Sequence, residues 1–252
     1  MGKLFGFTYD SNDWTLFDMI WPWIGLAAAI MILTLLFLTN IFRIDPGISR
    51  WRDTSFLSWL AIPIYMIHEF EEYGIDFRGN NHAFPNALCD NLNLGNYPAC
   101  TIPHEFYLYV NIPLVWFFAV LAAILSPKNI LIGFGLFSVI ISNAMAHILT
   151  FFLKKEYNPG LFSAIVIFLP SFFWLYKACF TEGGLPRKGI AVLVGTGIIL
   201  HVILITSLFA FVDQKIPRMM LNFIQLFNAS TIILIPWLSS NRLRMDIGKK
   251  IG

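Results

Sequence analysis

Residues 189–211 read GIAVLVGTGIILHVILITSLFAF, an apolar run without a single Asp, Glu, Lys or Arg. About 20 such residues are needed to cross the hydrocarbon core of a bilayer as a helix, so this run predicts a transmembrane span. Six further runs of similar length occur along the chain. The sequence therefore predicts an all-α polytopic membrane protein, a single domain over 1–252, with seven spans near 18–42, 53–73, 104–125, 129–153, 159–180, 188–211 and 217–240.

The composition supports the same class. Only 13% of the 252 residues are charged, 57% are apolar and the mean hydropathy is +0.68. A soluble domain carries about a quarter of charged residues, which it needs to cover its surface. The net charge of +2 is too small to indicate a nucleic-acid partner. The expected partners are the lipid bilayer and a lipid or amphiphilic substrate.

The basic residues predict an orientation in the cell membrane. Eleven Lys and Arg fall on one side of the seven predicted spans and six on the other. Because cytoplasmic loops are enriched in Lys and Arg, the N-terminus is expected outside and the C-terminus in the cytoplasm. The basic residues of the predicted cytoplasmic side are Arg43, Arg50, Arg52, Lys128, Lys177, Arg187, Lys188, Arg242, Arg244, Lys249 and Lys250.

One connection, at about 74–103, is long, and this orientation places it outside. It contains Cys89 and Cys100. Two cysteines facing an oxidising compartment can form a disulfide, but two free thiols in a long loop are an equally good interpretation.

Ionisable residues inside predicted spans are costly and indicate a functional site. The second span ends in His68-Glu69-Phe70-Glu71-Glu72. Glu71 and Glu72 lie three and four residues after His68, so the three side chains share one helix face. In the fourth span, Asn143 and His147 have the same i,i+4 relation. Both spans run from inside to outside, which brings His68 and His147 to similar depths near the outer end.

Other polar residues are expected at the same depth. His104 and Glu105 begin the third span, Asn111 follows two turns later, and Tyr157-Asn158-Pro159-Gly160 opens the fifth. The convergence depends only on the alternation of the spans. It predicts a polar pocket in the outer half of the bundle.

The residues of this pocket resemble a known family. His68, Glu71 and Glu72 form an H-x-x-E-E motif. Asn111, the string from Asn143 to His147 and the YNPG sequence at 157–160 follow in the expected order. The chain thus resembles the HXXEE family of small integral membrane proteins over roughly residues 55–180. The resemblance implies that these residues act together, and it supplies no activity or substrate.

Imidazole and carboxylate are ligands for zinc, iron or manganese. We expect His68, Glu71 and His147 to bind a divalent metal ion, with zinc or iron as the leading candidates. Glu72 is then the expected general base, and Asn143 or Tyr157 positions the substrate or the His147 ring. The alternative is a hydrogen-bonded network that fixes helix packing. Against it, two acids end a helix, where its dipole disfavours negative charge.

Other polar residues have plainer expected roles. His104 is a weaker candidate for a fourth ligand. Asn158 is expected to cap the fifth helix, and His201 and Gln225 are expected to form interhelical hydrogen bonds.

The leading functional prediction is metal-assisted hydrolysis of a lipid or amphiphile by a membrane enzyme. The alternative is a proton- or cation-coupled transporter that uses the same His and Glu residues. A structural or partner-binding membrane subunit is a third class, which the buried acids disfavour.

Overall fold

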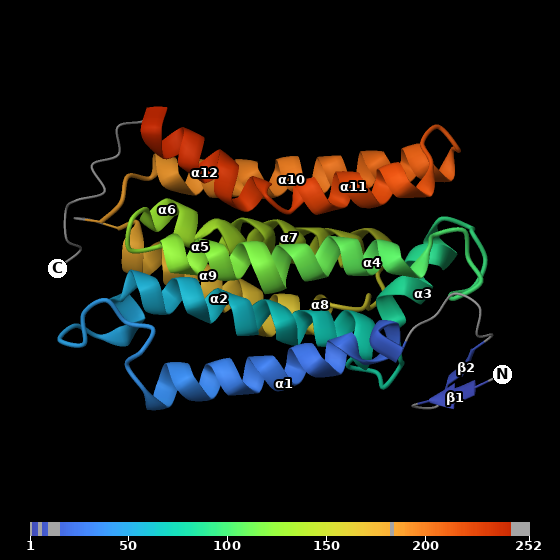
Figure 1. Cartoon of the computed structure of the whole chain (residues 1–252), viewed down its shortest axis with the longest axis horizontal. Helices are drawn as coiled ribbons and strands as arrows, with labels where there is room; N and C mark the ends of the chain where they lie inside the picture. Colours follow the sequence, from blue (N-terminus) through green and yellow to red (C-terminus); the bar gives the residue numbers. More distant parts are fainter. Residues whose placement is uncertain (1, 5–6, 10–15, 182–183, 243–252) are drawn as a thin grey trace.

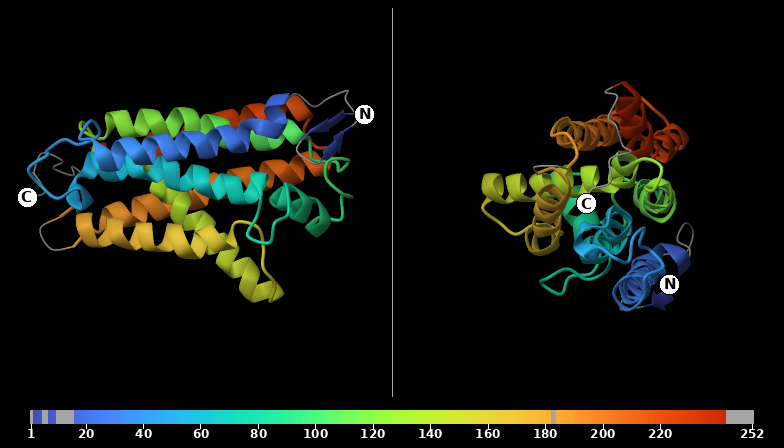
Figure 2. Two further views of the ribbon diagram at one scale, coloured as in Figure 1. Left: turned by 90° about the horizontal axis from the view of Figure 1, so that it is seen from below. Right: turned by 90° about the vertical axis from the view of Figure 1, so that its left-hand side faces the viewer.

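The computed structural model describes residues 2–4, 7–9, 16–181 and 184–242, and most of its helices run along one axis (Figure 1). The helix Gly135–Lys154 is tilted across the others, and its C-terminal end projects from the bundle (Figure 2). The strands β1 and β2 form a short antiparallel hairpin before the bundle. The elements are β1 (Gly2–Leu4), β2 (Phe7–Tyr9), α1 (Leu16–Leu38), the 3-10 turn η1 (Arg50–Arg52), α2 (Thr54–Glu69), the π-helix η2 (Phe70–Gly74), α3 (Ala83–Asn91), α4 (His104–Asn111), the π-helix η3 (Ile112–Phe118), α5 (Ala119–Leu125), α6 (Ile130–Gly133), α7 (Gly135–Lys154), α8 (Leu161–Ser163), the π-helix η4 (Ala164–Phe168), α9 (Leu169–Cys179), α10 (Lys188–Val212), α11 (Arg218–Asn228) and α12 (Thr231–Arg242).

The predicted all-helical fold is confirmed, and the seven spans are confirmed only in part. Within the described residues, five helical segments are long and apolar enough to cross a membrane. A sixth is obtained if α11 and α12, which meet at a bend of 43°, count as one span. The segment Thr54–Gly74 is not among them, because it contains one histidine and three glutamates within its last turns.

Helix α2 can have this polar end because other helices surround it. It packs against α1, α5, α6 and α7, and most of its side chains are buried. Its start is fixed by Asp53, whose carboxylate accepts hydrogen bonds from the backbone N–H groups of Ser55 at 3.0 Å and Phe56 at 3.1 Å. The polar residues of α2–η2 thus face protein rather than lipid, which is the usual place for ionisable side chains at membrane depth.

The outside of the bundle is apolar, as lipid contact requires. Helix α11 shows this most clearly, because Gln225 and Asn228 are buried whereas most of its apolar side chains are exposed. Gln225 is buried and donates to Ser207 of α10 at 2.7 Å, whereas Phe227 and Met219 are each 70% exposed. An amphipathic helix of a soluble protein has the opposite arrangement.

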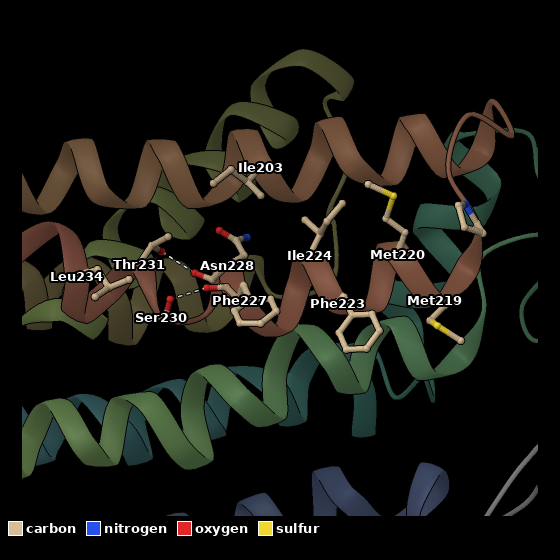
Figure 3. A pocket seen from close by; sticks show the side chains of 11 residues that line it. Ile203, Met219, Met220, Phe223, Ile224, Phe227, Asn228, Ser230, Thr231 and Leu234 are labelled. Carbon is tan, nitrogen blue, oxygen red and sulfur yellow. Dashed lines mark hydrogen bonds between the residues drawn. The ribbon is translucent and has the colours of Figure 1, made fainter.

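A groove runs between α10 and the bent pair α11–α12 (Figure 3). Its volume is about 660 Å³, and its described lining residues include no ionisable side chain. At the bend, hydroxyl groups satisfy carbonyls: Ser230 donates to the Phe227 carbonyl and Thr231 to the Asn228 carbonyl. The groove is therefore lined mainly by apolar side chains.

Cys89 and Cys100 form a disulfide, which resolves the two interpretations of the long loop. Cys89 lies in α3, and the bridge holds this helix over the end of the bundle, where it packs with Tyr73 and Tyr107. The loop is therefore a folded cap on the end where the polar residues gather.

Successive loops alternate between the two ends of the bundle (Figure 1). The connections after α1, α5 and α9 lie at one end, and those after η2 and α10 lie at the other. Which end is cytoplasmic stays a prediction. Three of the basic residues that support it, Arg244, Lys249 and Lys250, lie outside the described residues.

Candidate metal centre

His68 is fully buried near the end of α2, and its ring is held by the start of the fifth helical segment. The Nδ1 atom lies 2.7 Å from Ser163 Oγ. Ser163 Oγ also makes a very short hydrogen bond to the carboxylate of Glu71, which accepts from the Ser163 N–H at 2.7 Å as well. Because a carboxylate can only accept, the hydroxyl donates to Glu71 and is left to accept from Nδ1–H of His68. The Nε2 atom of His68 then carries the lone pair.

Glu71 is satisfied without a metal. Besides Ser163, it accepts from the Tyr157 hydroxyl at 2.9 Å and from the Phe162 N–H at 3.2 Å. These N–H groups belong to the first turn of α8, where a helix has free donors and favours negative charge. The dipole of α2 predicts a cation beside this acid, whereas Glu71 contacts a helix start and two hydroxyl groups instead.

His147 on α7 is oriented in the same way by another residue. Asn158 donates its Nδ2 to the His147 carbonyl at 3.0 Å, which leaves its Oδ1 as the acceptor for His147 Nδ1 at 2.6 Å. The proton of the His147 ring is therefore on Nδ1 and the lone pair on Nε2. This Nε2 atom is buried and has no hydrogen-bond partner among the described residues.

Both lone pairs face Glu72. Its Oε1 atom lies 3.5 Å from His68 Nε2 and 3.2 Å from His147 Nε2. The three candidate ligand atoms all lie within 4.8 Å of one another. Ligand atoms about 2.0–2.1 Å from a tetrahedral zinc ion are themselves roughly 3.4 Å apart. His68, Glu72 and His147 therefore have the composition and spacing of a two-histidine, one-carboxylate metal site.

The structure reverses the expected arrangement of the two glutamates. Glu71 was predicted to join the histidines as a ligand and Glu72 to lie beside them as a base. Glu72 lies at the histidines, and Glu71 holds the ring of His68 through Ser163. The π-helix η2 covers both glutamates and widens this turn, so α-helical spacing did not show which of them faces α7.

Gly160 brings the loop after α7 against both imidazoles. Its φ angle is +91°, and a Cβ atom built there would lie 2.5 Å from His147 Cε1 and 2.8 Å from His68 Cε1. Only glycine combines this left-handed conformation with so close an approach. The YNPG sequence thus contributes three contacts to the site, through Tyr157, Asn158 and Gly160.

Several other predicted residues have different roles. Asn158 does not cap the fifth helix with its side chain, because that side chain holds His147. Tyr157 contacts Glu71, and Asn143 lies 3.1 Å from His68 Nε2, where it occupies the lone pair. An ion bound to His68 would replace Asn143 as the partner of that nitrogen.

His104 does not reach the cluster. Its ring lies 3.6 Å from Asp18 and 3.7 Å from Glu105, which also contacts Arg218. The predicted interhelical hydrogen bonds of the other residues are confirmed: His201 of α10 contacts Ser142 of α7 at 3.2 Å, and Gln225 contacts Ser207. Ser163 was not identified from the sequence, since nothing marks a serine in an apolar run as a partner of a distant histidine.

Tyr157 lies outside the spans, in the loop between α7 and α8. Burial, followed by its hydrogen bond to the Glu71 carboxylate, raises the pKa of its phenol above the ordinary value. The hydroxyl therefore remains a donor to Glu71 throughout the physiological pH range.

A chamber of about 320 Å³ adjoins the cluster. Glu72, Asn143 and His147 contribute to its wall, and the rest is mainly apolar. It lies between η3, α7 and α10, with α3 as its outer cover. The cluster thus has the open side that a catalytic metal site needs for water and substrate.

Together, the fold and the site define a helical protein with several segments able to cross a membrane and a buried His-Glu-His group next to a chamber. Residues 59–175 match the model of the family described as "Protein of unknown function with HXXEE motif". The matched segment contains the whole His68-Glu72-His147 cluster, and the match confirms the resemblance that the motif indicated. No curated protein and no solved structure shows significant similarity to the chain.

Proposed function

We propose that this chain is a metal-dependent hydrolase of the cell membrane that acts on a lipid or amphiphilic substrate. His68, Glu72 and His147 would bind a divalent ion, zinc or iron, in the half of the bundle that we assign to the outer side. The observation that carries this proposal is the direction of the two rings. Each donates its Nδ1 proton to a protein oxygen, and each presents its Nε2 lone pair to the same oxygen of Glu72.

The residues around the cluster have distinct roles in this proposal. A bound ion would lower the pKa of a coordinated water and polarise the carbonyl of an ester or amide. The second oxygen of the Glu72 carboxylate would accept the proton of that water, and Asn143 would hydrogen-bond to the substrate in the chamber. Glu71, Ser163, Tyr157 and Asn158 are positioning residues, because they contact the imidazoles or each other and do not coordinate the ion.

Metal content tests the proposal. Protein purified in detergent should contain about one equivalent of zinc or iron by elemental analysis, and His147→Ala should lose it. His201→Ala is the matched control, since His201 is also a hydrogen-bonded histidine within a span but belongs to no such cluster. Absence of metal from wild-type protein, after reconstitution with each ion, would reject the metal site and the hydrolase with it.

One observation favours the transporter as a second candidate. The carboxylate of Glu69 is 1% exposed and has no hydrogen bond within the described part of the chain, although the Trp116 indole lies nearby. Buried acids of this kind occur in proton pathways. The test is proton flux into vesicles that contain the protein. Flux that is present in wild type and lost in Glu69→Gln would support the transporter over the enzyme, provided that the wild-type protein hydrolyses no ester.

A further inference from the structure

The chamber is elongated along α7, and the cluster lies toward one end. Its lining residues on α7 extend from Val139 to Thr150. Eleven residues of helix correspond to roughly 16 Å. His147 is only three residues from Thr150 but eight from Val139. Part of the chamber therefore lies deeper in the bundle than the candidate metal site, and the rest extends under α3.

The deep part has mainly apolar walls, to which Tyr65 and His201 also contribute. Its walls are formed by Leu114 of η3, Val139 of α7 and Leu200 of α10, all at most 4% exposed. A volume of about 320 Å³ accommodates roughly ten non-hydrogen atoms if each occupies the space of a water molecule in the liquid, about 30 Å³. This space fits a single alkyl chain.

The shallow part has an unused polar group. Among the described residues that line the chamber, two buried polar atoms lack a hydrogen-bond partner: Nε2 of His147 and the hydroxyl of Tyr107. Tyr107 lies in the first turns of α4 under the disulfide-bonded cap, and its side chain is 3% exposed. Buried hydroxyl groups are nearly always paired, so this one indicates a ligand.

We infer that the chamber binds a single-chain amphiphile of about ten carbons. Its chain lies along α7 against Leu114, Val139 and Leu200, and its polar group lies between His147 and Tyr107. The Tyr107 hydroxyl donates a hydrogen bond to an oxygen of that group. The inference rests on the proposed function for the bond that is cleaved, whereas binding of the chain itself requires no metal.

Photolabelling tests where the chain lies. The probe is a ten-carbon alcohol with a diazirine on its penultimate carbon, which is neutral and cannot be hydrolysed. It should label peptides that contain Leu114 or Leu200, and Val139→Trp should reduce this labelling at least tenfold. Phe117→Trp is the control, because Phe117 lies in η3 with Leu114 but is 62% exposed and does not line the chamber.

A second chamber variant keeps the test valid if Val139→Trp fails to fold. Ala146 lines the chamber on an accessible part of α7, so Ala146→Trp fills space without crowding the core. It should reduce the labelling to the same extent. Labelling that is unchanged in both chamber variants, or that occurs only on lipid-exposed faces, would overturn the inference.

Competition experiments test Tyr107. In Tyr107→Phe, the concentration of 1-decanol needed to displace the probe should rise about tenfold, while that of decane, which has no oxygen, should stay the same. Tyr109→Phe provides the control, since Tyr109 is on the same helix but is 39% exposed. Equal displacement by decanol in wild type and Tyr107→Phe would contradict the assigned contact.

The outcome is separable from that of the proposed function. Glu72→Gln should lose hydrolysis and metal but retain probe labelling, because the apolar part of the chamber is intact. If the wild-type protein binds the probe but no metal, the proposed enzyme is rejected and the chamber inference stands. If it binds metal but the probe does not label the chamber, the chamber inference is rejected and the metal site stands.

Discussion

Two groups of histidines and carboxylates lie toward the same end of the bundle, and their ring nitrogens face different partners. At His68 and His147, one nitrogen of each ring contacts a neutral oxygen, and the other faces Glu72. At His104, the two ring nitrogens face two different carboxylates, Asp18 and Glu105. The first arrangement leaves two lone pairs directed at one point, and the second is an ion-pair contact. The partner of each ring nitrogen, rather than the number of His and Glu residues, therefore distinguishes a candidate metal site from a group that only forms ion pairs between helices.

The largest expected effect comes from Gly160. In Gly160→Ala the added methyl group would overlap both imidazoles of the cluster, in addition to the cost of the left-handed backbone. We expect loss of the bound metal and a decrease in stability of about 3 kcal/mol or more. Metal analysis and thermal unfolding in detergent would measure the two effects.

Gly79→Ala is the matched control for this change. Gly79 has a similar φ angle of +84°, but a Cβ atom there would meet nothing within 4 Å. It should lose only the backbone contribution of about 1 kcal/mol and retain its metal. Equal losses in the two variants would show that the loop does not position the imidazoles.

The two glutamates separate a ligand from a positioning residue. Glu72→Gln should reduce metal affinity by more than a hundredfold, because it removes a charged ligand. Glu71→Gln should reduce it by about ten- to a hundredfold, as is usual for residues that orient a ligand. Titration with a competing chelator would give both values, and a larger loss in Glu71→Gln would restore the assignment expected from the sequence.

The group of His104, Asp18 and Glu105 should stabilise helix packing without binding the metal. His104→Ala should keep the full metal content and lower Tm by several degrees, because His104, with a side chain only 12% exposed, lies between two carboxylates. Loss of metal from this variant would mean that the two groups form one site.

The smallest effect concerns Tyr157 and alkaline pH. Its pKa is raised in the folded state, so between the unfolded and folded pKa values the folded protein holds a proton that the unfolded chain has released. Stability from this group is complete below the unfolded pKa near 10 and declines as pH rises above it. Tyr157→Phe should flatten the decline in Tm above pH 10, and an unchanged slope would contradict the buried hydrogen bond to Glu71.

The sequence predicted the architecture well, because apolar length is a local property. The ends of the helical segments lie close to the predicted spans, and His68 and His147 meet as the alternation of spans required. The predicted span at 53–73 is not confirmed, because the polar end of α2 suits a membrane only when other helices surround it. The local sequence pattern does not show which helices surround α2.

Within the site, the sequence identified the residue types and missed their pairing. Glu71 and Glu72 both follow His68 at helical spacing, and the choice between them depends on η2 and on the free N–H groups at the start of α8. The role of Ser163 depends on a contact over 95 residues of chain. Such pairings arise from tertiary structure and leave no periodic signal.

The most direct test of the central claim is X-ray absorption at the edge of the bound metal. We predict two imidazole nitrogens and one carboxylate oxygen at about 2.0–2.2 Å, with one imidazole lost in His68→Ala and one in His147→Ala. A first shell containing sulfur, or one that both substitutions leave unchanged, would show that these two histidines and Glu72 do not hold the ion.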